Sequence, residues 1–346
     1  MRDGMIAAVF TPMTEGGEVN YSGIRSYINY LLRVQCTWFV FSSIVSLRFP
    51  PVVLADRNMF PLSQVVSGFL VGGTTGEGLL LTAEVRKRLL DEWVVHSPKG
   101  TPIFFNCSST SLDEAKQLAQ AAKIARCAGI LCMCPLPSAG CSEMDVVSWC
   151  TTVANVAPEV PFYYYHFPDK TGCRFSLYSI YSLMIERIPS LRGVKFSDGN
   201  IMDLFRCQEL DALDSNRTIF IGKDELILTD LLHSGKKRIA AMGSTFNFLG
   251  ASFRQMEQAW SAEDVGSCQA INQKILRDIA SFCFGSKPLA AQKYLTALAG
   301  LPLGPVQFAS QRLTAAEEIA LKRSSAGMAV IAYVPSTPNS PAVSKQ

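Results

Sequence analysis

One lysine stands near the end of a short apolar segment, where a charged side chain is unusual. Lys195 lies in the segment RGVKFSDG. Burial takes water away from an ammonium group and favours the neutral amine, which is the form that attacks a carbonyl carbon to make a Schiff base. The alternative is a lysine whose long aliphatic chain carries its ammonium group out to solvent. Lys195 is therefore a candidate nucleophile for carbonyl chemistry.

A tyrosine hydroxyl could carry the protons that such chemistry needs. Tyr165 stands near the end of the aromatic segment YYYHFP, after which Pro168 turns the chain. A hydroxyl at the end of a strand can pass a proton to and from a substrate oxygen. These aromatic residues can also be ordinary strand residues that pack on both faces, and at most one or two of the three tyrosines can face a substrate.

The segment GGTTGEG is a candidate carboxylate site. Its glycines let the backbone come close to a ligand, and Thr74 and Thr75 supply hydroxyls next to backbone amides. Glycine-rich turns with a threonine that caps a helix are common, so this segment alone does not decide between a binding site and a turn.

Two further segments carry polar side chains after apolar ones. IGKDE contains Asp224 and Glu225, and GSTFN contains Ser244. Such side chains can hold the hydroxyl groups of a polyol through hydrogen bonds. The two carboxylates could equally be favourable charges in the first turn of a helix.

Eight short apolar segments alternate with helical patterns and predict the elements that position these residues. Their lengths and uninterrupted hydrophobicity are typical of strands buried on both faces. Strand and helix in alternation predict parallel pairing, and eight units favour an α/β protein with a closed TIM (β/α)8 barrel over an open doubly wound sheet. The segments are 5–10, 69–73, 102–107, 129–134, 161–166, 192–196, 218–222 and 238–243.

The rest of the chain predicts one domain with an appendage. The strand pattern stops near residue 250, and helical patterns follow to about residue 325. We therefore expect a single barrel domain over residues 1–325 with C-terminal helices from about 250. The segment 326–346 is rich in serine, proline and small residues, which predicts a tail without regular structure.

Composition points to a small-molecule partner in a reducing compartment. The chain has 346 residues, of which 48% are apolar, and its net charge of +3 is not gathered into a basic run. This pattern argues against nucleic-acid or membrane-surface binding. Eleven cysteines without a paired zinc-type spacing indicate reduced thiols, and MRDGMIAAVFTPM lacks a long apolar signal, so we expect a cytoplasmic protein.

One stretch, residues 36–69, does not fit the alternation. It contains WFVFSSIV and then Arg48, Pro50 and Pro51. Its uncharged part is about half of the roughly 20 residues that a membrane-spanning helix needs, which argues against a membrane span. It also has no helix period and no alternation long enough for an extra barrel unit, so we interpret residues 36 to about 66 as an insertion between the first helix and the second strand. WFVFSSIV could compete with SGFLVGG for the second strand position and move Thr74 and Thr75 out of register.

Taken in order, GTTGEG, YYYHFP, GVKFSDG, GKDE and GSTFNFLG resemble the pyruvate-dependent class I aldolase family. That family includes dihydrodipicolinate synthase and 4-hydroxy-2-oxoglutarate aldolase, and YYYH, GVKFSD and the adjacent acidic pair are most similar to its sialic acid branch. TPMTEGGEVN and GLPLGP extend the resemblance over most of the chain outside the insertion and the tail.

The resemblance implies a homotetrameric lyase without a metal or other cofactor, which reversibly cleaves N-acetylneuraminate to N-acetylmannosamine and pyruvate. Lys195 would form the Schiff base, Tyr165 would move protons, and further residues would bind substrate: Thr74, Thr75, Ser197, Gly222, Asp224, Glu225 and Ser244. The alternatives are an aldolase or synthase for another 2-oxo acid, such as 4-hydroxy-2-oxoglutarate, and a non-catalytic product disrupted by the insertion. The chain departs from the family at Leu136 and Pro137, where an aromatic residue is usual, and at Lys223.

Overall fold

The computed structural model describes residues 4–33, 66–214, 216–282 and 287–332. Most of the predicted insertion, including WFVFSSIV, and the last fourteen residues fall outside these ranges.

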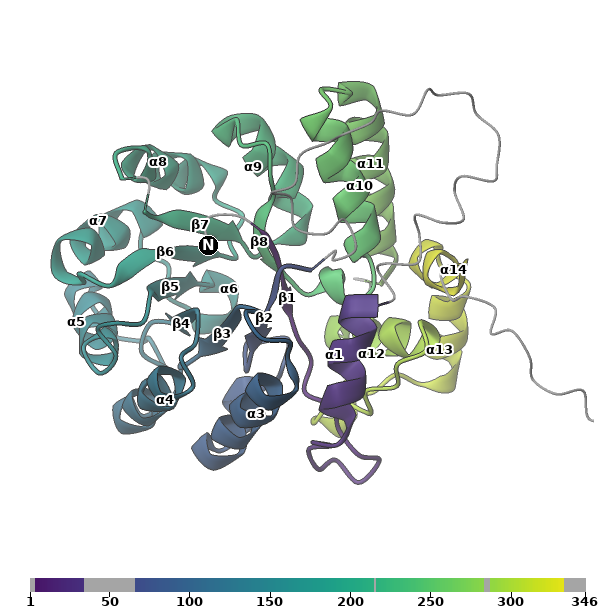
Figure 1. Ribbon diagram of the computed structural model, residues 1–346, viewed down its shortest axis with the longest axis horizontal. Helices are drawn as coiled ribbons and strands as arrows, with labels where there is room; N and C mark the ends of the chain where they lie inside the picture. The colour runs from purple at the N-terminus through teal and green to yellow at the C-terminus, as the bar shows by residue number, and fades with distance from the viewer. Residues whose placement is uncertain (1–3, 34–65, 215, 283–286, 333–346) are drawn as a thin grey trace, which may run out of the picture.

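Eight parallel strands close into a barrel in chain order, β1 next to β2 and so on to β8, which pairs with β1 (Figure 1). The closed ring confirms the predicted (β/α)8 barrel over the open sheet. Each strand matches one of the eight apolar segments. Their bounds are Gly4–Ala8, Gly68–Val71, Ile103–Asn106, Gly129–Cys132, Phe162–His166, Leu191–Phe196, Thr218–Ile221 and Ala240–Gly243.

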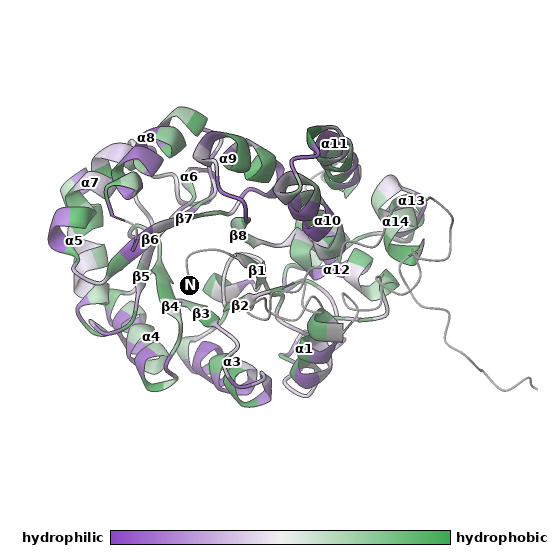
Figure 2. Ribbon diagram, turned by 45° about the horizontal axis from the view of Figure 1, so that its top comes forward, coloured by the Kyte–Doolittle hydropathy of each residue, from purple (hydrophilic) through white to green (hydrophobic). Residues whose placement is uncertain are grey.

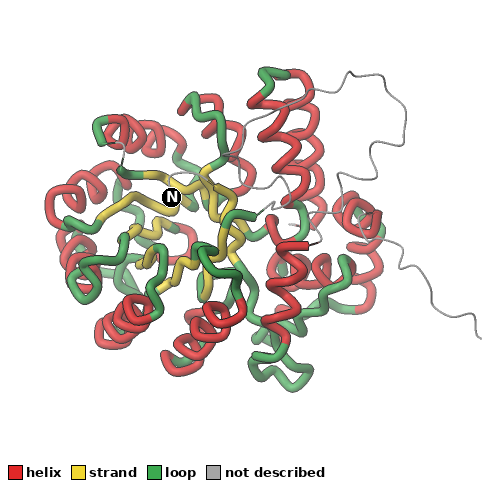
Figure 3. Tube along the Cα trace, viewed as in Figure 1, coloured by secondary structure: helices red, strands yellow, loops and turns green. Residues whose placement is uncertain are grey.

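Helices surround the ring of strands (Figure 3). Around the barrel they are α1 (Gly23–Arg33), α3 (Ala83–His96), α4 (Leu112–Ile124), α5 (Glu143–Ala154), α6 (Pro168–Thr171), α7 (Leu177–Arg187), α8 (Ile201–Ala212) and α9 (Ile227–Ser234). Short 3-10 turns follow several strands: η2 (Gly78–Leu80), η3 (Asp224–Leu226) and η4 (Thr245–Asn247), and a further one, η5, spans Ala309–Gln311. Ser111 caps the N-terminus of α4, because its side chain accepts a hydrogen bond from the backbone N–H of Glu114.

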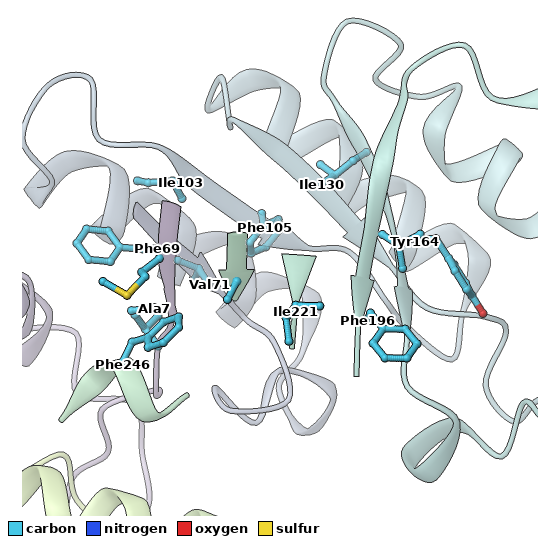
Figure 4. Close-up of a cluster of buried hydrophobic side chains, with 14 of the residues drawn as sticks. Ala7, Phe69, Val71, Ile103, Phe105, Ile130, Tyr164, Phe196, Ile221 and Phe246 are labelled. Carbon is cyan, nitrogen blue, oxygen red and sulfur yellow. The ribbon is translucent and has the colours of Figure 1, made fainter. Parts of the chain in front are cut away.

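The alternation of side chains along each strand divides the core in two. Tyr163 and Tyr165 belong to a cluster inside the barrel, whereas Tyr164 between them packs outward against the helices. Figure 4 shows part of the outer cluster, with Tyr164, Phe105 and Phe196 among its labelled members. The surrounding helices carry hydrophobic and hydrophilic residues side by side (Figure 2), as is expected where one face packs on strands and the other meets solvent.

The C-terminal part is helical, as predicted, and lies on one side of the barrel near α1 (Figure 1). It comprises α10 (Gly250–Ser261), α11 (Val265–Phe282), α12 (Pro288–Leu298), α13 (Ala315–Lys322) and α14 (Ser325–Ala332). Helix α14 corrects the prediction of an irregular tail from residue 326. Ala326 and Val330, four residues apart, are buried there, and α14 packs against α11, α12 and α13.

The second strand is formed by the segment expected for it. Gly68–Val71 pairs with β1 and β3, so Thr74 and Thr75 directly follow a barrel strand. The segment WFVFSSIV lies outside the described residues. None of the helices in the described ranges is long and apolar enough to cross a bilayer.

Candidate active site

Lys195 lies inside the barrel near the C-terminal end of β6. Its register partners are Tyr165 on β5 and Phe220 on β7, both of which belong to the interior cluster. The lysine is only 4% exposed, which excludes the alternative of an ammonium group that reaches solvent. Its Nζ atom donates a hydrogen bond of 3.1 Å to the hydroxyl of Tyr165. The buried amine therefore has a polar partner at hand inside the barrel.

The Tyr165 hydroxyl connects Lys195 to the glycine-rich turn. It lies 3.1 Å from the Oγ1 atom of Thr74 as well as 3.1 Å from the Lys195 amine. Phe167 stacks on the Tyr165 ring with the ring centroids 5.9 Å apart. The three residues predicted from separate segments thus form one continuous hydrogen-bonded chain, whose central hydroxyl can accept a proton from one side and donate one to the other.

The turn that carries Thr74 and Thr75 requires a glycine at position 78, where the backbone passes close to Gly72. A Cβ atom on Gly78 would lie 2.0 Å from the carbonyl oxygen of Gly72, so a larger residue cannot replace it without moving the backbone. The Thr11 hydroxyl donates a hydrogen bond of 2.5 Å to the carbonyl oxygen of Gly76. The two threonines are held at the barrel mouth with partly exposed side chains.

Polar groups without protein partners lie on the loops after β6 and β7. The Ser197 hydroxyl and the Oδ1 atom of Asp224 are buried and have no hydrogen-bond partner among the described residues. A Cβ on Gly222 would lie 2.2 Å from the Ser197 hydroxyl, and one on Gly243 would lie 2.1 Å from Asp224 Oδ1. Because glycine has no side chain, Gly222 leaves room for the Ser197 hydroxyl and Gly243 leaves room for Asp224 Oδ1. A buried polar atom without a partner is costly, which makes both atoms candidate ligand contacts.

Asp224 is held by a residue that the sequence did not single out. The backbone N–H and the hydroxyl of Thr245 donate hydrogen bonds of 3.0 and 2.7 Å to Asp224 Oδ2. Burial raises the pKa of Asp224 to about 6, and these hydrogen bonds oppose that shift. Thr245 lies in the GSTFN segment, directly after Ser244. Its position after the eighth strand is the feature of the sequence from which it could have been predicted as a site residue.

Asn247 fixes the same loop from the other side. Its Nδ2 atom donates hydrogen bonds to the carbonyl oxygens of Ala8 (2.8 Å) and Ser244 (2.6 Å), and its Oδ1 atom accepts one from the Tyr27 hydroxyl. These contacts join β1, α1 and the loop after β8. Ser244 is thereby placed at the mouth, with a partly exposed side chain.

The structure brings the remaining predicted residues to the same end of the barrel without joining them to the lysine. Thr75, Glu225 and Ser244 lie on the loops after β2, β7 and β8, and their side chains are partly exposed. The part of the chain that the structure describes has no group of three or more histidine, cysteine, aspartate or glutamate side chains placed to hold a metal ion.

Comparison with known proteins identifies the family of the chain. The sequence model of the dihydrodipicolinate synthetase family matches residues 54–320, more than three quarters of the chain. The chain belongs to this family. Among curated relatives, N-acetylneuraminate lyase of Homo sapiens is 30% identical over 331 residues, covering 92% of this chain and 91% of the relative. N-acetylneuraminate lyase B of Xenopus laevis is 33% identical over 295 residues, covering 84% and 96%.

Solved structures of this family share the fold. N-acetylneuraminate lyase of Proteus mirabilis superposes with a TM-score of 0.78 at 23% identity, over 95% of this chain and 98% of that one. The sialic acid aldolase of Ruminococcus gnavus gives 0.79 at 17% identity, over 96% and 98%. DHDPS from Cyanidioschyzon merolae gives 0.75 at 21% identity, over 94% and 97%. These likenesses show the same barrel with its C-terminal helices.

The two departures from the family pattern both lie at the barrel mouth. Leu136 packs against the interior cluster in the loop after β4, while Pro137 beside it is exposed. One wall near the site is therefore aliphatic in this family member. Lys223 is partly exposed, and its Nζ atom is 3.7 Å from where a Cβ on Gly199 would lie. This contact places the Lys223 ammonium group over the loop after β6.

Proposed function

We propose that this protein reversibly cleaves N-acetylneuraminate to N-acetylmannosamine and pyruvate through a Schiff base on Lys195. The observation that carries the proposal is the hydrogen-bonded chain of Lys195, Tyr165 and Thr74, with 3.1 Å between each pair of neighbouring polar atoms. Curated relatives that are 30% to 33% identical and named N-acetylneuraminate lyase support the choice of substrate.

The first half of the mechanism builds the imine. The neutral Lys195 amine attacks the keto carbon of the open-chain substrate, and the resulting carbinolamine loses its hydroxyl as water to give a protonated imine. Tyr165 donates the proton that the departing hydroxyl needs, because its hydroxyl is hydrogen-bonded to the amine. Thr74 and Thr75 hold the substrate carboxylate at the edge of the barrel mouth, which fixes the keto carbon beside Lys195.

The second half breaks the carbon–carbon bond. Tyr165, now deprotonated, takes the proton from the hydroxyl on the β carbon, and the bond between the α and β carbons breaks to leave an aldehyde. The electron pair of that bond moves to the protonated imine nitrogen and forms an enamine. Protonation of the α carbon and addition of water then release pyruvate and restore the free amine. Every atom and electron is accounted for by substrate, water and the protein, so the step needs no redox partner.

Polar groups beyond the lysine supply contacts for the sugar chain. The unpaired Ser197 hydroxyl and Asp224 Oδ1 would bind substrate hydroxyls, with Glu225 and Ser244 further along the mouth. Gly222 leaves room for Ser197 and for the lysine side chain. An acidic side chain that accepts hydrogen bonds from hydroxyls favours a polyhydroxylated substrate over a short oxo acid.

A comparison of two substrates tests the proposal. Release of pyruvate from N-acetylneuraminate and from 4-hydroxy-2-oxoglutarate is measured under the same conditions, with Lys195→Met as the inactive control. We expect efficient release from N-acetylneuraminate alone. Preference for the short oxo acid would assign the alternative activity within the family, and a folded protein without activity on either would contradict both.

We also propose that the protein acts as a cytoplasmic homotetramer without a cofactor. The resemblance to the pyruvate-dependent aldolases supports this assembly. Light scattering on the purified protein is expected to give four times the chain mass, and dialysis against a metal chelator is expected to leave the cleavage rate unchanged. A monomer, or activity that requires an added metal ion, would contradict this part of the proposal.

A further inference from the structure

Glu77 adopts a backbone conformation that glycine adopts more easily. Its φ is 53° and its ψ is 29°, which is the left-handed region, and it lies between Gly76 and Gly78 in the GTTGEG turn. A side chain with a Cβ atom is disfavoured there. The presence of a glutamate at such a position indicates that its side chain makes a compensating contact.

That contact is a buried ion pair with the C-terminal helices. Glu77 is 7% exposed and Lys293, on α12, is 4% exposed, and Lys293 Nζ lies 3.6 Å from Glu77 Oε1. The other carboxylate oxygen accepts a hydrogen bond of 2.8 Å from the backbone N–H of Gln307, and Lys293 donates one of 2.8 Å to the carbonyl oxygen of Pro305. The turn after β2 is thus tied to α12 and to the segment that follows it.

The pair is connected to the catalytic chain through the same turn. The backbone N–H of Glu77 donates a hydrogen bond of 3.0 Å to the carbonyl oxygen of Thr74, whose hydroxyl contacts Tyr165. Glu77 is therefore joined directly to the residue whose hydroxyl contacts Tyr165.

The positive charge of Lys293 matters for substrate binding as well as for holding the turn in place. The turn is the proposed site of the substrate carboxylate, and a glutamate carboxylate buried three residues away would repel that anion. Charges out of water interact more strongly than charges at the surface, so the repulsion is weakly screened unless a cation cancels it. Burial lowers the pKa of Lys293 to about 8 and the Glu77 carboxylate opposes that shift, so the ammonium form predominates at neutral pH.

We propose that Lys293 is a positioning residue whose charge cancels that of Glu77, so that the glutamate can tie the turn to the C-terminal helices without repelling the substrate carboxylate. The inference deepens the proposed function and rests on it, because Thr74 and Thr75 are taken to bind the carboxylate of pyruvate. It gives the helices beyond the barrel a part in substrate binding.

The test uses the full-length protein and borohydride trapping of the pyruvate adduct on Lys195. It measures the half-saturating pyruvate concentration, at which trapping reaches half of its maximal rate. The variant Lys293→Gln keeps a donor for the Pro305 carbonyl oxygen and removes the charge. We expect it to raise the half-saturating pyruvate concentration about tenfold, while the trapping rate at saturating pyruvate changes less than about threefold. The matched control Lys293→Arg keeps the charge and is expected to stay near the wild-type value.

The double variant separates charge from structure. Glu77→Gln combined with Lys293→Gln removes both charges, and we expect its half-saturating concentration to return to within about threefold of wild type, as does that of Glu77→Gln alone. A pair that is only structural would give no recovery in the double variant. That result, or a Lys293→Gln protein with wild-type half-saturation, would overturn the inference.

Two controls keep the outcomes distinct. Near-UV circular dichroism must match wild type for a variant to be compared, and if Lys293→Gln fails this requirement, Lys293→Met removes the same charge with an apolar side chain of similar length. If wild-type protein itself forms no adduct with pyruvate, the proposed function fails and the inference falls with it. If wild type is trapped and the variants behave alike, only the inference fails.

Discussion

Gly222 offers a direct test of whether the geometry around Lys195 sets the rate of imine formation. A Cβ atom at this position would lie 2.2 Å from the Ser197 hydroxyl, 2.9 Å from Lys195 Cε and 3.2 Å from the carbonyl oxygen of Phe196. Non-bonded carbon atoms pack at about 3.5–4.0 Å, so Lys195 Cε must move by about 0.6–1.1 Å in Gly222→Ala. The amine moves with it, which disturbs the 3.1 Å hydrogen bond from Lys195 Nζ to the Tyr165 hydroxyl.

We expect Gly222→Ala to lower the rate of adduct formation strongly and the free energy of unfolding only slightly. A misplacement of a reacting group by about 1 Å can cost about 100-fold, so we predict that Gly222→Ala forms the reduced pyruvate adduct about 30- to 100-fold more slowly. The two closest atoms belong to side chains that can rotate, and an off-rotamer side chain costs about 0.5–1.5 kcal/mol, so the free energy of unfolding should fall by about 1 kcal/mol.

The assay is the rate of borohydride trapping at saturating pyruvate, measured by intact-protein mass. Gly199→Ala is the matched control, because a Cβ there meets only Lys223 Nζ at 3.7 Å, an ordinary contact. If Gly222→Ala is trapped as fast as Gly199→Ala while both remain folded, the packing of Lys195 against Gly222 does not control its reactivity.

Two further changes follow from the same site. Tyr165→Phe removes the hydroxyl between Lys195 and Thr74, and we predict a fall in the cleavage rate of about 10²- to 10⁴-fold with slow adduct formation retained; near-normal turnover would contradict its role in proton transfer. In Asp224→Asn the buried carboxylate is gone. Because the folded-state pKa of Asp224 is raised from 3.8 to about 6, ionisation destabilises the native protein fully above about pH 6 and not at all below about pH 4. Chemical denaturation should therefore show Asp224→Asn more stable than wild type by up to about 3 kcal/mol at pH 7, with the gain vanishing by about pH 4, and a gain independent of pH would contradict this reasoning.

The barrel and the placement of Lys195, Tyr165 and Thr74 at one end of it could be predicted because they depend on local patterns. Uninterrupted apolar segments mark strands buried on both faces, and residues at the C-terminal ends of such strands meet at one end of a closed barrel. Lys195, Tyr165 and Thr74 follow this rule, and the structure places them in hydrogen-bonding sequence.

The supporting contacts could not be predicted, because they join residues far apart in the chain. Glu77 and Lys293 are separated by more than 200 residues, and nothing in GTTGEG indicates a cation on α12. Asn247 reaches Tyr27 on α1 in the same way. Helix α14 was missed because its composition resembles that of a loose tail, although it buries side chains against three neighbouring helices.

The most direct measurement on the central claim is the site of the covalent intermediate. Purified protein is incubated with N-acetylneuraminate, reduced with borohydride and digested, and the modified peptide is located by mass spectrometry, with Lys195→Met treated in parallel. We expect a pyruvate adduct on Lys195 alone, together with release of N-acetylmannosamine before reduction. A folded protein that releases both products without an adduct, or that carries the adduct on another lysine, would contradict it.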